Sequence, residues 1–234
     1  MRITVVGASG LIGAKVVDVL RSEGHDVVAA SRSTGLDVLT GDGLADALVG
    51  ADAIIDVTNS PSFEADAVMR FFTTSAANIA AAAKSAGVGH YVALSIVGVD
   101  GLPDSPYMRA KVAQEKIITD SGVPYSMVRA TQFAEFADGI VESLTVGNEV
   151  RVPDALIQPI PADEVAAAVA HAAVAEPING IVNIGGQMKI TVEQMARDVL
   201  ARQGDDAKVV VVDPEARYFG AALSMSSLVT RDTG

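Results

Sequence analysis

The chain has 234 residues, half of them hydrophobic, and a formal net charge of −12. This length fits one large domain, or one domain with a small lobe. The negative charge disfavours nucleic acid and anionic membranes as partners, since both are polyanions, and the absence of cysteine excludes disulfides and thiolate chemistry.

The sequence shows no pattern typical of a signal peptide, a membrane span or a metal site. The apolar N-terminal run breaks at once into a glycine-rich turn, so it does not resemble a signal peptide, and no apolar stretch reaches the roughly 18–20 residues of a membrane span. The three histidines are scattered without metal-ligand spacing. We expect a cytoplasmic protein that binds a small-molecule substrate and no metal, as a monomer or a homodimer.

The chain opens with the pattern of one βαβ unit. A β-branched run at residues 2–6 leads into a glycine-rich turn, a helical pattern that ends near Gly24, and a second apolar run at residues 27–30. A strand, helix and strand within about 30 residues is the usual size of one crossover unit. The sequence therefore predicts two parallel strands at its start.

The alternation continues to residue 130. The expected helices are 43–50, 63–86 and 106–121, and the expected strands are 53–57, 90–97 and 124–130. Strands that alternate with helices predict a doubly wound parallel sheet of the α/β, Rossmann-like class.

Beyond Ala130 the pattern becomes less regular and contains several prolines. It predicts helices at 134–146, 163–175 and 191–203, and strands at 149–152, 180–184 and 208–212. We expect a dinucleotide-binding core at residues 1–130. Residues 131–234 are expected to form a smaller substrate-side lobe over the open end of the sheet, within one compact domain.

The turn after the first strand carries the signature of a phosphate site. Gly7, Gly10 and Gly13 are spaced G-x-x-G-x-x-G between a strand and a helix. Glycine allows the backbone to approach a pyrophosphate, and the helix N-terminus offers unpaired N–H groups to it. This placement predicts dinucleotide binding.

The end of the second expected strand favours the phosphorylated cofactor. Enzymes that use NAD usually carry an acidic residue there for the ribose 2′-hydroxyl, but this chain has Ser31, Arg32 and Ser33. An arginine suits a 2′-phosphate, because its planar fork forms charge-assisted hydrogen bonds. The predicted cofactor is NADP rather than NAD.

Three residues further along suggest proton transfer to a carbonyl. Tyr107 and Lys111 lie one helical turn apart on the same face, and Ser95 ends the strand before that helix. A nearby ammonium favours the ionised phenol, so the tyrosine can exchange a proton with a substrate oxygen that the serine orients.

The combination of the glycine turn, Ser95 and Tyr107-x-x-x-Lys111 resembles the short-chain dehydrogenase/reductase superfamily. Residues 92–100, 105–117, 121–136 and 213–220 are similar to its atypical, NmrA-like branch of NAD(P)-binding oxidoreductases. The resemblance implies an active-site trio of Ser95, Tyr107 and Lys111.

The resemblance also implies a full set of binding residues. Those expected around the cofactor are Gly7, Ser9, Gly10, Leu11, Ile12, Arg32, Asp37, Val38, Thr58, Asn59 and Lys111; those expected to line the nicotinamide and substrate pocket are Ala130, Thr131, Gln132 and Phe133. Asn78 occupies a place where such families often carry a structural or catalytic asparagine.

The leading hypothesis is an NADP(H)-dependent oxidoreductase that transfers hydride between the nicotinamide and a small carbonyl, quinone or related substrate. One alternative is a non-catalytic NADP(H) sensor, since some NmrA-like proteins keep the fold and lose catalysis. A nucleotide-sugar epimerase or dehydratase is another, against which the C-terminal region offers few Arg or Lys residues to hold a diphosphate.

Overall fold

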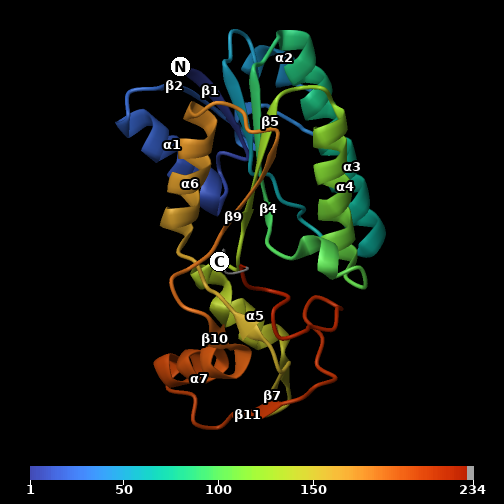
Figure 1. Cartoon of the computed structure of the whole chain (residues 1–234), viewed down its shortest axis with the longest axis vertical. Helices are drawn as coiled ribbons and strands as arrows, with labels where there is room; N and C mark the ends of the chain where they lie inside the picture. The colour runs from blue at the N-terminus through green and yellow to red at the C-terminus, as the bar shows by residue number, and fades with distance from the viewer. Residues whose placement is uncertain (231–234) are drawn as a thin grey trace.

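The computed structural model describes residues 1–230, and its main layer is a parallel sheet (Figure 1). Six strands pair in the order β2-β1-β3-β4-β5-β9, every pair parallel. They are β1 (Arg2–Val6), β2 (Asp26–Ala30), β3 (Ala53–Asp56), β4 (His90–Ile96), β5 (Tyr125–Ala130) and β9 (Gly180–Ile184). The doubly wound α/β prediction is confirmed.

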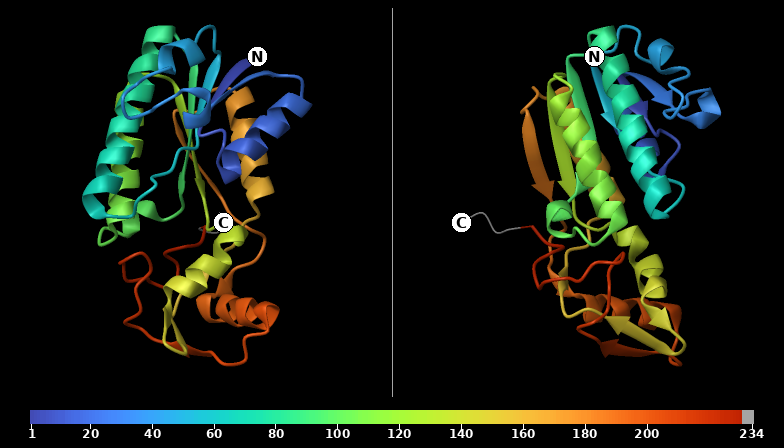
Figure 2. Two further views of the ribbon diagram at one scale, coloured as in Figure 1. Left: turned by 180° about the vertical axis from the view of Figure 1, so that it is seen from behind. Right: turned by 90° about the vertical axis from the view of Figure 1, so that its right-hand side faces the viewer.

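Helices cover both faces of this sheet (Figure 2). α1 (Leu11–Ser22) packs against α6 (Ala162–Val174) on one face, and α3 (Ala65–Ala86) packs against α4 (Pro106–Asp120) on the other. The short α2 (Leu44–Ala47) contacts α3. A parallel sheet covered on both faces needs apolar side chains in both directions, which explains the nearly continuous apolar strands.

The alternation of side chains along β4 determines which face each residue serves. Val92 is buried in the core beside α1 and α6, whereas Tyr91 and Ala93 are buried in the core beside α3 and α4. Ser95 is two residues beyond Ala93, so its side chain points to the same face as those of Tyr91 and Ala93. It therefore lies on the face of the sheet that α4 covers.

A smaller lobe lies beyond the carboxyl ends of the main strands (Figure 1). It contains α5 (Ala137–Ser143), α7 (Val192–Gln203), a three-stranded sheet and a two-stranded pair. The strands are β6 (Thr145–Val146), β7 (Glu149–Val152), β8 (Leu156–Ile157), β10 (Ile190–Thr191) and β11 (Val209–Val212). Its core includes Val150 and Val199 and continues to Met108 of α4, so the lobe packs directly on the main layer.

Two elements expected in the lobe belong instead to the main layer. The expected helix 163–175 is α6, whose buried alanines and valines pack on α1, and the expected strand 180–184 is β9, which pairs with β5. The expected helix 134–146 is shorter than predicted, because a 3-10 turn at Ala134–Phe136 precedes α5. The division of the chain at residue 130 remains a prediction.

Among residues 1–230, no helix is both long and apolar enough to cross a membrane.

Candidate active site

The carboxyl ends of the six parallel strands share one edge of the sheet, and the candidate site lies there. From β1 the chain moves outward to β2 and then returns past β1 to β3, so the direction of strand order reverses between β1 and β3. Open α/β sheets bind ligands in the crevice at such a switch point. The glycine turn follows β1 and the segment of Thr58 and Asn59 follows β3.

Gly7 begins the turn in a conformation that requires glycine. Its φ is +89°, and its N–H donates to Ala30 O over 3.0 Å. A Cβ at this position would lie 2.9 Å from the carbonyl oxygen of Val57. The loops after β1 and β3 therefore meet with no room for a side chain.

Gly13 brings the start of α1 against the same turn. A Cβ on Gly13 would lie 2.1 Å from the backbone oxygen of Gly7. No side chain caps the N-terminus of α1 at Gly10, and the first turn of the helix has no acidic residue. The first N–H groups of α1 are therefore available to an anion such as a pyrophosphate.

The other expected phosphate contacts differ in exposure. Ser9 and Leu11 are exposed beside the turn, whereas Ile12 is buried in the core between the sheet and α1. Ile12 can therefore offer a ligand only its backbone N–H.

Arg32 lies in a short 3-10 turn at Arg32–Thr34, directly after β2. Ser31 caps this turn through reciprocal hydrogen bonds with Thr34. The Arg32 side chain is exposed, and within the described part of the chain it forms no hydrogen bond or ion pair. The guanidinium is therefore available to a ligand phosphate.

Asp37 and Asn78 hold the loop that follows. The Asp37 carboxylate accepts from Leu39 N over 2.7 Å and from Thr40 N over 3.3 Å. The Asn78 side chain donates from α3 to the carbonyl oxygens of Val38 and Leu39, over 2.9 and 3.0 Å. Both side chains thus fix the shape of this loop, and Asn78 has a structural role.

Tyr107 lies in the first turn of α4, where Ser105 caps the helix. Its hydroxyl donates to Asn59 Oδ1 over 2.8 Å. The rings of Phe63, Phe72 and Phe219 surround it with centroids 5.5, 5.6 and 6.2 Å away. Burial raises the pKa of Tyr107 to about 12, opposite to the direction expected from a neighbouring ammonium. Tyr107 is therefore a neutral phenol at neutral pH.

Lys111 is 4% exposed, one turn further along α4. Its Nζ donates to Leu94 O over 2.9 Å and to Gln114 Oε1, and lies 4.7 Å from the centroid of the Phe72 ring. Burial lowers the pKa of Lys111 to about 8, against the opposing effects of Asp56 and Glu115. The ammonium reaches the backbone of β4 next to Ser95.

Ser95 is 4% exposed, and among the described residues its hydroxyl has no hydrogen-bond partner. A buried hydroxyl without a partner is costly, so such groups often mark functional positions. The structure places Ser95 on the α4 face beside the contact of Lys111 with Leu94.

The four expected pocket residues follow β5. Ala130 is buried in the core beside α6, and Thr131 Oγ1 donates to Gln158 O over 2.5 Å. Gln132 is 8% exposed, and neither polar atom of its amide has a partner among the described residues. The Phe133 ring stacks against Phe136 at 5.3 Å. Of the four, only Gln132 has free polar atoms.

The sequence interpretation missed two buried polar residues of this site. Asp56 and Gln114 are each 1% exposed, and Gln114 Nε2 donates to Asp56 Oδ2 over 3.0 Å. A carboxylate that ends an otherwise apolar strand was a visible signal for Asp56. Gln114 gave no comparable signal, because a helical glutamine is ordinarily solvated.

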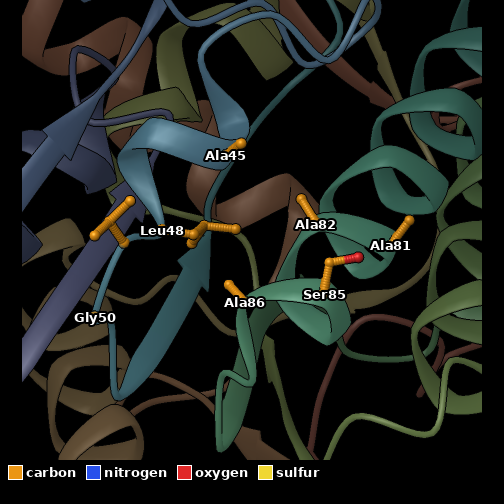
Figure 3. A pocket seen from close by; sticks show the side chains of 8 residues that line it. Ala45, Leu48, Gly50, Ala81, Ala82, Ser85 and Ala86 are labelled. Atoms are coloured by element: carbon orange, nitrogen blue, oxygen red, sulfur yellow. The ribbon is translucent and has the colours of Figure 1, made fainter.

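A surface depression lies between α2 and the C-terminal end of α3 (Figure 3), and none of the candidate site residues lines it. Its lining is mainly alanine with Leu48, Val49, Gly50 and Ser85, and contains no ionisable side chain. It therefore does not contribute to the candidate chemistry.

The glycine turn lies at the switch point, and Ser95 and Lys111 lie near the carboxyl end of β4, where open α/β sheets bind nucleotides. The family model described as NAD(P)H-binding matches residues 7–176. The chain therefore belongs to the NAD(P)H-binding family.

Curated relatives are similar over part of their length. A (4-alkanoyl-5-oxo-2,5-dihydrofuran-3-yl)methyl phosphate reductase of Streptomyces griseus is 34% identical over 145 residues, which are 56% of this chain and 48% of the relative. The photosystem II assembly factor Ycf39 of Synechocystis is 26% identical over 60% of this chain and 47% of its own. The chain thus spans about half the length of these relatives.

Solved structures support the fold. A dTDP-4-dehydrorhamnose reductase of Clostridium acetobutylicum superposes with a TM-score of 0.76 at 18% identity, over 95% of this chain and 89% of its own. A Thermus thermophilus UDP-glucose 4-epimerase in complex with NAD gives 0.74 at 18% identity, over 97% and 92%. The Citrobacter triphenylmethane reductase complexed with NADP(H) gives 0.66 at 18%, over 92% and 80%.

The residues present fit a dinucleotide. A Cβ at Gly7 or Gly13 would clash with the backbone of Val57 or Gly7, so glycine lets the turn pack against the start of α1, whose first N–H groups are free. Two buried polar side chains without partners, Ser95 and Gln132, lie at the same edge of the sheet. The glycine turn and these free polar groups are of the kind that a nicotinamide dinucleotide binds.

Proposed function

We propose that this chain is an NADP(H)-dependent oxidoreductase of the short-chain dehydrogenase/reductase type, in its NmrA-like branch, acting on a small carbonyl, quinone or related substrate. The observation that carries the proposal is the hydrogen bond of 2.9 Å from Lys111 Nζ to Leu94 O. It ties the lysine to the residue before Ser95, while Tyr107 lies one turn away on the same helix face. The name of the Streptomyces relative, a reductase, is consistent with this chemistry.

Tyr107, Lys111 and Ser95 would each have a separate role in proton transfer. The bound cofactor would supply the hydride. Tyr107, whose pKa of about 12 keeps it protonated, donates its proton to the substrate oxygen. Lys111 stabilises the phenolate that remains, and the free hydroxyl of Ser95 orients the same oxygen by a hydrogen bond.

The preference for NADP rests on Arg32. Its exposed guanidinium follows β2 and has no partner within residues 1–230, and no carboxylate stands beside it in the turn Arg32–Thr34. An arginine in this position meets a 2′-phosphate with charge-assisted hydrogen bonds.

Replacement of Tyr107 tests the assignment. Tyr107→Phe keeps the ring and its aromatic contacts but removes the proton, so turnover with NADPH should fall by about 10²–10⁴-fold while NADPH affinity is retained. The matched control is Tyr125→Phe. Tyr125 begins β5, at the end of the strand far from the candidate site, and its hydroxyl has no partner among the described residues. Turnover that survives in Tyr107→Phe would remove Tyr107 from the mechanism.

A non-catalytic NADP(H) sensor is the second candidate, favoured by a specific contact. The Tyr107 hydroxyl is already hydrogen-bonded to Asn59, and the rings of Phe63 and Phe219 pack against the Tyr107 ring. The Ycf39 relatives are named as assembly factors rather than enzymes. A sensor would bind NADPH and NADP⁺ with different affinities and show no turnover with a panel of aldehydes, ketones and quinones.

A further inference from the structure

The carboxylate of Asp56 is buried at the end of β3 and held by four donors. Its Oδ2 accepts from Tyr91 Oη and Gln114 Nε2, each over 3.0 Å. Its Oδ1 accepts from Thr58 N over 3.0 Å and from Thr58 Oγ1 over 2.7 Å. So many hydrogen bonds compensate the burial of the charge and fix the orientation of the carboxylate.

Gln114 connects this carboxylate to Lys111. Its Nε2 donates to Asp56, and its Oε1 accepts from Lys111 Nζ. A side-chain amide has one donor end and one acceptor end, so the bond to Asp56 determines that the oxygen faces the ammonium. The reverse orientation would turn N–H groups toward a positive charge.

Lys111 needs a compensating charge because burial favours its neutral form. Two carboxylates act on it, Asp56 of β3 and Glu115 of α4, and the centroid of the Phe72 ring from α3 lies 4.7 Å from its Nζ. Glu115 is bound by Arg129, with Nε–Oε1 and Nη2–Oε2 distances of 2.9 and 2.6 Å. Asp56 is bound only by neutral donors, and its charge acts on Lys111 more strongly than that of Glu115 does.

We infer that Asp56, acting through Gln114, is a positioning residue that keeps Lys111 protonated and held at the backbone of Leu94, next to Ser95. The inference rests on the proposed function, because it concerns the lysine to which that function gives a role. Neither residue touches the reacting atoms. The effect of each passes through the charge state and direction of one ammonium group.

The test is the pKa of Lys111 in the intact chain without cofactor. It is measured by NMR titration of isotope-labelled lysine side chains, with Lys111→Arg used to assign the signal. Asp56→Asn keeps the shape and removes the charge, so the pKa of Lys111 should fall by about one pH unit. Gln114→Met keeps the volume and removes the bridge, so it should lower the pKa in the same direction.

The controls are matched to these changes. Gln194→Met removes a similar glutamine–aspartate bond, from Gln194 Nε2 to Asp198 Oδ1 over 2.7 Å, on the exposed face of α7. It should leave the Lys111 signal unchanged. Lys116, which pairs with Asp120 on the exposed side of α4, serves as the internal reference.

An unchanged pKa of Lys111 in either folded variant overturns the inference. Loss of fold in both variants, checked by circular dichroism, also overturns it, since the network would then serve stability alone. With NADPH and an acceptor, the pH dependence of kcat should move in the same direction as the pKa. A wild-type chain without turnover would contradict the proposed function and leave the NMR result standing.

Discussion

The hydroxyl of Tyr107 donates to Asn59 Oδ1 over 2.8 Å, which joins the first turn of α4 to the segment after β3. Asn59 Oδ1 also accepts from Ser60 N over 2.9 Å, so its side chain is held from two directions. The expected proton donor and an expected cofactor contact are thus one hydrogen-bonded unit.

This unit predicts energetic coupling between the two side chains. In a double-mutant cycle of Tyr107→Phe and Asn59→Ala, we expect a coupling energy of about 0.5–1.5 kcal/mol in the free energy of unfolding, the net contribution of one hydrogen bond. Urea denaturation followed by circular dichroism measures it. Effects that add to within about 0.3 kcal/mol would show that the contact has no energetic weight.

A methyl group at Gly13 should damage both folding and binding. The Cβ would lie 2.1 Å from Gly7 O, a backbone atom that cannot move without opening the turn. We expect Gly13→Ala to lower the free energy of unfolding by about 1–3 kcal/mol and to abolish NADPH binding measured by fluorescence titration. Gly139→Ala is the control: its Cβ would meet nothing within 4 Å in α5, so it should be neutral or stabilising. A Gly13→Ala chain that binds NADPH normally would contradict the role of the glycine turn in binding the pyrophosphate.

Arg32 should determine cofactor preference without affecting stability. Arg32→Ala removes an exposed side chain that has no partner within the described residues, so the unfolding curve should not change. NADPH should bind about 10–100-fold more weakly, as expected from losing hydrogen bonds between charged groups, and NADH should bind as before. Arg70→Ala, an exposed arginine on α3, should change neither affinity. If the unmodified chain binds NADH as tightly as NADPH, the proposed preference for NADP is wrong.

His90 should make stability depend on pH on the acid side. It is 3% exposed with Nε2 2.8 Å from Ser126 Oγ, and burial lowers its pKa below 6.5. Below that value the unfolded chain binds a proton that the folded chain does not, so the free energy of unfolding falls as the pH falls.

The measurement for His90 is urea denaturation at about pH 7.5 and about pH 5.5, on either side of an ordinary histidine pKa. His90→Gln should flatten the difference between the two, because glutamine does not titrate. His171→Gln removes an exposed histidine of α6 and should leave the difference unchanged. A His90→Gln chain that keeps the full wild-type difference would show that another group is responsible.

Local pattern was enough to predict the sheet and the glycine turn after its first strand. Apolar β-branched runs separated by helical patterns predict parallel strands, because two neighbouring parallel strands need a long crossover connection, which is usually a helix. Gly7, Gly10 and Gly13 were recognisable because their spacing and their place after β1 are properties of a short segment. The expected strand 180–184 coincides with β9 for the same reason, although its place beside β5 was not foreseen.

The surroundings of the reactive side chains were decided by tertiary structure alone. The sequence placed Tyr107 and Lys111 on one helix face and suggested that the ammonium would favour the phenolate. The fold instead covers Tyr107 with Phe63 and Phe219 and binds Lys111 between Leu94 and Gln114. Burial then moves the pKa of Tyr107 up to about 12 and that of Lys111 down to about 8. Such effects depend on contacts between segments far apart in the chain, so the sequence determines which groups are present and the packing determines their protonation.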